Sequence, residues 1–103
     1  MFQTSIMNVI SKRTLVQFYE QQPQAKSALE VWHSDARKSN WSCPADIKKI
    51  YSSASFLSDN RVIFNIKEND YRLIVHIDYP RKILRVKSVG THAEYDKIDA
   101  KKI

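Results

Sequence analysis

Apolar residues in the first half of the chain recur with the spacing of amphipathic helices. A short apolar run at residues 7–10 suits an opening strand. Apolar side chains then occupy positions 15, 18 and 19, the i, i+3, i+4 spacing of one helical face. This pattern predicts a helix over residues 12–22, with Ser11 as its N-cap.

Two further helices are predicted from prolines, whose fixed φ suits the first turn of a helix. Pro23 starts the second helix, and Pro44 starts a short third helix over residues 44–51. The second helix carries an apolar stripe of Ala25, Ala28, Leu29, Trp32 and Ala36. The third directs Ile47, Ile50 and Tyr51 inward.

The period of the apolar residues changes from 3.6 to 2 after the Ser-rich stretch at residues 52–60. Three segments then alternate in the manner of strands, at residues 61–67, 71–79 and 83–89. Short polar turns separate them, so the segments form an antiparallel meander. Helices followed by such a meander indicate an α+β fold with the helices packed on one face of a small antiparallel sheet.

The opposite face of this sheet is predicted to be basic. It would carry Arg61, Asn65, Lys67, Arg72, His76, Arg85 and Lys87, with Asp78 as the one acid on these strands. A solvated sheet face with ordinary polar residues is the alternative explanation. The formal net charge of +6 and the pI of about 9.6 favour a face that meets a polyanion.

Length and composition narrow the class of protein further. A chain of 103 residues with 43% apolar residues makes one small domain. The sequence has neither an apolar run of about 20 residues, the length of a membrane span, nor a signal peptide at its start. The single Cys43 has no partner for an internal disulfide, which suits a reducing cytoplasm. Metal-ligand spacings and Gly-rich phosphate loops are missing as well.

Metal-free cleavage of RNA is a chemistry that these residues support. The 2′-hydroxyl attacks the adjacent phosphate, and the protein supplies a base, an acid and cations. Arg72, Arg85 and Lys87 lie on predicted strands, and His92 and Tyr95 follow the last strand just after Gly90. Taken alone, His92 could be an ordinary loop histidine and Tyr95 a core residue. The other two histidines, His33 and His76, are predicted to lie at an edge or on the surface.

The runs NRVIFNIKENDYRLIVHIDY and VKSVGTHAEYDKIDA resemble the HigB family of toxin–antitoxin toxins, within the wider RelE-like fold. The resemblance covers residues 7–103, which we expect to form a single toxin domain, and leaves residues 1–6 as an extension. The positions that match the family motif are Asn69, Arg72, Thr91, His92, Tyr95 and Asp96. The family pattern has Arg and an aromatic residue where this chain has Lys87 and Ser88, and lysine lacks the bidentate fork of arginine.

The resemblance implies a RelE-like microbial RNase fold and an endoribonuclease that cuts mRNA on the ribosome. It implies no metal or cofactor, and a HigA-type helix-turn-helix antitoxin through which alone the complex contacts DNA. We expect His92, Arg72, Lys87 and Tyr95 to be catalytic. The residues expected to bind RNA are Arg61, Asn65, Lys67, Asn69, His76, Arg85 and Lys97. Two other readings stay open: a basic module that blocks translation without cutting RNA, and a domain whose positive face seats an acidic antitoxin segment.

Overall fold

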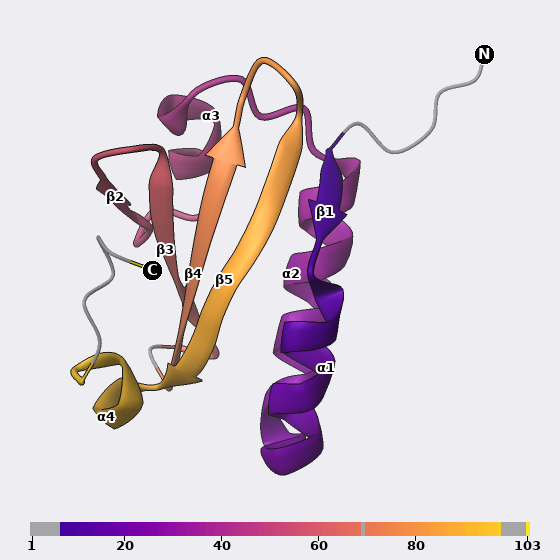
Figure 1. Ribbon diagram of the computed structural model, residues 1–103, viewed down its shortest axis with the longest axis vertical. Helices are drawn as coiled ribbons and strands as arrows, with labels where there is room; N and C mark the ends of the chain where they lie inside the picture. Colours follow the sequence, from indigo (N-terminus) through magenta and orange to yellow (C-terminus); the bar gives the residue numbers. More distant parts are fainter. Residues whose placement is uncertain (1–6, 69, 98–102) are drawn as a thin grey trace.

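The computed structural model describes residues 7–68, 70–97 and 103, and these form one five-stranded sheet with helices against it (Figure 1). The strands are β1 (Asn8–Ile10), β2 (Ser55–Leu57), β3 (Arg61–Ile66), β4 (Tyr71–Asp78) and β5 (Ile83–Thr91), in the spatial order β1-β5-β4-β3-β2. The pairs β2–β3, β3–β4 and β4–β5 are antiparallel. The α+β class is therefore confirmed, but β1 joins β5 in parallel, so the sheet is not purely antiparallel as expected.

The helices follow the predicted order with shorter bounds. They are α1 (Lys12–Gln21), a 3₁₀ turn (Pro23–Ala25), α2 (Lys26–Lys38), α3 (Pro44–Lys48) and α4 (His92–Tyr95). Ser11 occupies the N-cap position of α1 as expected, but its side chain makes no capping hydrogen bond. Ser11 instead turns the chain from β1 into α1 with a left-handed φ of 70°, and its carbonyl accepts from the N–H of Thr14.

The main core lies between α1, α2 and one face of the sheet. Phe64 of β3 is fully buried at its centre. The rings of Trp32, Trp41 and Tyr51 surround it at centroid distances of 5.4, 6.0 and 5.2 Å. The packing of the helices on one face, predicted from the apolar stripes, is confirmed by this cluster.

Two local expectations were wrong, and one strand was not foreseen. Ile50 is 63% exposed rather than inward, because α3 ends at Lys48 and only Ile47 of its last turn reaches the core. The Ser-rich stretch contains the edge strand β2, whose backbone pairs with β3 although its residues lack a strand pattern. His33 is buried rather than peripheral, and burial, with the charges of Lys12 and Arg37, lowers its pKa.

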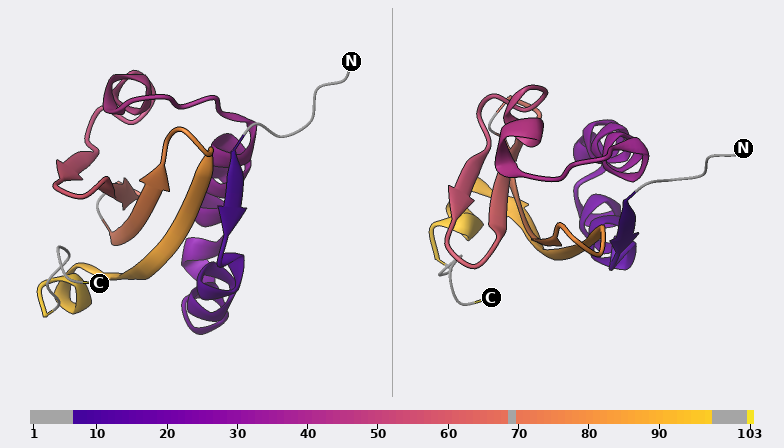
Figure 2. Two further views of the ribbon diagram at one scale, coloured as in Figure 1. Left: turned by 45° about the horizontal axis from the view of Figure 1, so that its top comes forward. Right: turned by 90° about the horizontal axis from the view of Figure 1, so that it is seen from above.

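The second face of the sheet is not the open polar surface that the alternation predicted. Ile63 and Ile74 are buried there, and Leu57, Tyr95 and Ile103 pack against them. Figure 2 shows α4 and the last residue on the side of the strands away from α1 and α2. This small second core fixes α4 beside the strands that carry the basic residues.

A β-bulge in β5 sets the register of this second face. Ile74 pairs with Ser88 and Val75 pairs with Val86, so Lys87 is the extra residue. Beyond the bulge, Gly90 lies opposite Arg72. Because directly paired residues of antiparallel strands point to the same face, the end of β5 and Arg72 share one side of the sheet.

Candidate active site

The segment after β5 folds into a single capped helical turn. The N–H of Glu94 donates to Thr91 Oγ1 at 3.2 Å, and the N–H of Thr91 donates to Glu94 Oε1 at 2.8 Å. This reciprocal pair is a capping box, which satisfies two backbone donors at the start of α4. Asp96, one of the positions that match the family motif, lies at the C-terminal end of this turn.

Gly90 is needed here because Glu94 folds back onto it. A Cβ atom at position 90 would lie 3.0 Å from Glu94 Oε1 and 3.1 Å from Glu94 Cβ, both closer than ordinary contact. The backbone of Gly90 has no positive φ, so the glycine serves close approach rather than an unusual turn.

Three of the four residues expected to be catalytic come together at this end of the sheet. Arg72 Nη2 is hydrogen-bonded to His92 Nε2, and the guanidinium lies over the ring of Tyr95, 5.0 Å from its centroid. Because a guanidinium only donates hydrogen bonds, His92 Nε2 must be the acceptor.

A small cavity of about 160 Å³ adjoins this cluster. Its lining residues come from β4, β5 and α4: Arg72, Ile74, Ser88, Val89, Gly90, Glu94 and Tyr95. Arg72 Nε is buried and has no hydrogen-bond partner among the described residues. Arg72 and Tyr95 thus line a small cavity at the end of β5, and His92, which is hydrogen-bonded to Arg72, lies next to them.

The remaining predicted cations lie outside this cavity. Lys87 is exposed in the bulge, and Lys97 is exposed after α4. Arg85 is exposed on β5 opposite the half-buried His76. Lys67 lies beyond the end of β3, in a turn with a φ of 53°, so it is not the strand residue that the alternation suggested. Asn69 lies outside the described residues.

Arg61 and Asn65 do not project from an open face as expected. The Arg61 side chain is 13% exposed, and its Nε and Nη2 donate to the main-chain oxygen of Ile103 at 2.8 and 2.6 Å. Its Nη1 forms an ion pair with Asp59 at 3.1 Å. Asn65 Nδ2 donates to the carbonyl of Ser53 at 3.2 Å. Both side chains hold neighbouring chain segments, and the alternation of residues gave no sign of these partners.

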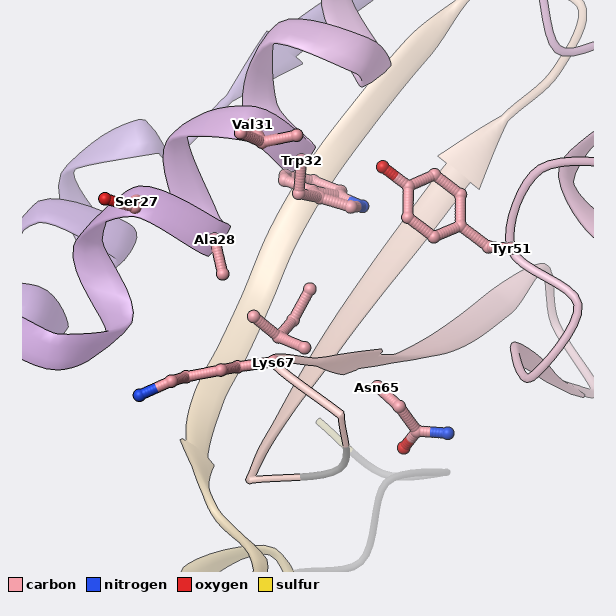
Figure 3. Close-up of a pocket in the computed structure, with 8 residues that line it drawn as sticks. Ser27, Ala28, Val31, Trp32, Tyr51, Asn65 and Lys67 are labelled. Carbon is pink, nitrogen blue, oxygen red and sulfur yellow. The ribbon is translucent and has the colours of Figure 1, made fainter.

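A larger cavity of about 350 Å³ opens elsewhere, between α2 and the end of β3 (Figure 3). Its lining is mostly apolar: Ser27, Ala28, Val31, Trp32, Tyr51, Asn65, Ile66 and Lys67. Figure 3 shows Trp32 and Tyr51 facing each other across it, with Lys67 at its edge. Histidine and carboxylate side chains are absent from this lining, so it lacks the groups for proton transfer near neutral pH.

Within residues 7–68, 70–97 and 103, no three His, Cys, Asp or Glu side chains are placed to hold a metal ion. None of the helices in the described part of the chain is long and apolar enough to cross a membrane.

Comparison with known proteins finds one family. The HigB_toxin family model, described as a RelE-like toxic component of a toxin-antitoxin system, matches residues 25–98. The mRNA interferase toxin HigB of Escherichia coli K12 is 25% identical over 92 residues, which cover 87% of this chain and 88% of that protein. The mRNA interferase HigB of Shigella flexneri gives the same values, and that of Escherichia coli O6:H1 is 26% identical over 94 residues, 89% of this chain and 91% of the relative.

Proposed function

The chain belongs to the HigB family of RelE-like toxins, the toxic component of toxin–antitoxin systems, and we propose from this premise that it is an endoribonuclease that cleaves mRNA. The observation that carries the proposal is the cluster of Arg72, His92 and Tyr95 beside a small cavity. The relatives that match most of the chain are named mRNA interferases. The three side chains supply a cation, a base and a hydroxyl that can act as the acid, the groups that metal-free RNA cleavage requires.

In the proposed reaction, the scissile phosphate binds Arg72. Its fork donates two parallel hydrogen bonds to the phosphate oxygens and stabilises the charge that grows on them. In turning to the phosphate, Arg72 releases His92 Nε2, which is then free to accept the proton of the 2′-hydroxyl. The 2′-oxygen attacks phosphorus, the bond to the 5′-oxygen breaks, and the products are a 2′,3′-cyclic phosphate and a 5′-hydroxyl.

Two further residues complete the proposed site. Tyr95 donates a proton to the leaving 5′-oxygen or stacks on a neighbouring base, the two roles its ring and hydroxyl support. Lys87 contributes positive charge from the bulge next to Ser88. Lysine acts there as a point charge without a fork, so its part in binding the phosphate is smaller than that of Arg72.

The biological setting of the proposal follows from the family. The message is cut while it is held on the ribosome, which orients the 2′-hydroxyl for attack and so removes part of the entropic barrier. We assign the chain to the cytoplasm, where translated messages are found, and treat residues 7–103 as one toxin domain. A HigA-type helix-turn-helix antitoxin neutralises the toxin and supplies the DNA contacts of the complex.

A basic face that blocks translation without cutting RNA is the competing function, favoured by the exposed Arg85 and Lys87. Primer extension on a translated message separates the two. We expect cut sites with the unaltered protein and with Arg81→Ala, which removes an exposed cation from the turn after β4. We expect none with His92→Ala. Arrested translation with intact message would refute cleavage and leave the blocking function.

A further inference from the structure

Two buried polar atoms on the second face of the sheet lack hydrogen-bond partners and belong to directly paired residues. Asn65 of β3 pairs with Arg72 of β4. Asn65 Oδ1 and Arg72 Nε are both buried, and neither has a hydrogen-bond partner among the described residues. Directly paired residues of antiparallel strands point to the same face, with their Cβ atoms about 5 Å apart. An unused acceptor and an unused donor are therefore neighbours on this face.

The orientation of the Asn65 amide is fixed by the main chain. Its Nδ2 donates to the carbonyl of Ser53 at 3.2 Å, and a carbonyl oxygen only accepts, so the amide cannot be reversed. Asn65 Oδ1 must then face away from Ser53. A side chain that is already held at one end loses little freedom when a donor reaches its free acceptor.

Arg72 directs its guanidinium elsewhere in this structure. Its Nη2 is hydrogen-bonded to His92, and the guanidinium lies over the ring of Tyr95. A buried donor or acceptor without a partner destabilises the state that contains it. The contact with His92 therefore leaves two buried atoms unpaired among the described residues. A turn of the guanidinium that brings Nε–H to Asn65 Oδ1 satisfies both of them.

We propose that Asn65 is a positioning residue for Arg72, and that it accepts the Nε–H when the guanidinium turns from His92 to the phosphate. This hydrogen bond occupies Nε and leaves Nη1 and Nη2 together as the fork that binds two phosphate oxygens. It also offsets the loss of the contact with His92. Asn65 then acts through Arg72 and does not itself contact the RNA. This inference rests on the proposed function, because it gives a cause for the movement of Arg72 in the same reaction.

The test is a double-mutant cycle on the single-turnover rate of cutting, measured with saturating toxin on a defined ribosome–message complex. Asn65→Leu is the first variant, because leucine has a similar shape but neither an acceptor nor a donor. We expect its rate to fall by roughly ten- to a hundredfold, the effect of one hydrogen bond to a charged group.

The second background of the cycle is Arg72→Ala, which has no Nε–H. There the same substitution of Asn65 should change the rate by less than about twofold, because the two residues no longer interact. If Arg72→Ala cuts too slowly to measure, Arg72→Lys replaces it, since lysine also lacks an Nε–H. A purely structural role of Asn65, through its hydrogen bond to Ser53, would instead lower the rate by the same factor in both backgrounds.

Asn8→Leu is the matched control, because it makes the same change at an exposed position on the edge strand β1. It should keep the rate of the unaltered protein. If Asn65→Leu does not fold, Asn65→Ala replaces it, since the smaller side chain cannot clash. Equal factors in both backgrounds, or a folded Asn65 variant within about twofold of the unaltered rate, overturn the positioning role but leave cleavage standing. A complete lack of cleavage by the unaltered protein overturns both.

Discussion

Replacing Arg72 by alanine should separate catalysis from stability. If Arg72 donates two charge-assisted hydrogen bonds to the phosphate in the transition state, their loss costs about 3–6 kcal/mol. At about 1.4 kcal/mol per factor of ten, the cleavage rate should fall by roughly 10² to 10⁴. The assay is the single-turnover rate of cutting on a defined ribosome–message complex.

The same substitution should change the fold little. Arg72 is half-buried, and it contributes one hydrogen bond to His92 and one cation–π contact with Tyr95. Together these stabilise the folded state by about 1–2 kcal/mol. Urea unfolding measures this loss directly, and the rate should be measured where the variant is fully folded.

The control is Arg81→Ala, which removes an exposed arginine that pairs with Asp78 in the turn after β4. We expect both its rate and its unfolding free energy to stay close to those of the unaltered protein. A folded Arg72→Ala variant whose rate lies within tenfold of the unaltered protein would refute the role of Arg72 in binding the phosphate. A loss of several kcal/mol in unfolding free energy would instead mark Arg72 as a structural residue.

Three further predictions concern the fold around the site. Phe64→Ala should lower the unfolding free energy by about 3–5 kcal/mol, because it leaves a cavity among three aromatic rings. Burial holds the pKa of His33 below its ordinary value of 6.5, so the unfolded chain binds the proton more readily and stability should fall as the pH drops below about 6.5. His33→Gln should remove this part of the acid sensitivity in urea titrations at several pH values. Gly90→Ala should push Glu94 out of the capping box, lowering stability by about 1 kcal/mol and reducing cleavage through the displaced α4.

Each of these predictions has a contrary result. If Phe64→Ala lowers the unfolding free energy by less than about 1 kcal/mol, neighbouring side chains have moved into the space that the ring left. If the unfolding free energy of His33→Gln falls with pH as steeply as that of the unaltered protein, groups other than His33 cause the acid sensitivity. Full cleavage by Gly90→Ala would show that the close approach of Glu94 does not position α4.

The main features of the fold could be predicted from residue periodicity. The stripe that includes Leu29 and Trp32 and the alternation around Phe64 identified the helices, the strands and the face that carries the core. Periodicity fails for Ile63 and Ile74. The alternation places them on the sheet face opposite the helices, among polar residues. They are buried there in a second core with Tyr95, because the chain returns to that face after β5.

The candidate site was partly predictable for a similar reason. Arg72 and His92 were identified by residue type and by the family motif, and their contact follows once Gly90 is opposite Arg72. That register depends on the bulge at Lys87, which a sequence pattern does not reveal. The partner of Arg61 could not be foreseen either, because the main-chain oxygen of Ile103 accepts its hydrogen bonds whatever side chain position 103 carries.

The parallel pairing of β1 with β5 has a consequence for the order in which the protein is made. The first strand of the described chain finds its sheet partner only in the last one, so every other strand is synthesised before the edge can close. Contacts between such distant segments form slowly, because a long loop must be closed first. Arg72 also meets His92 only after β5 has been synthesised. A growing chain on its own ribosome therefore lacks the assembled site until α4 has been synthesised.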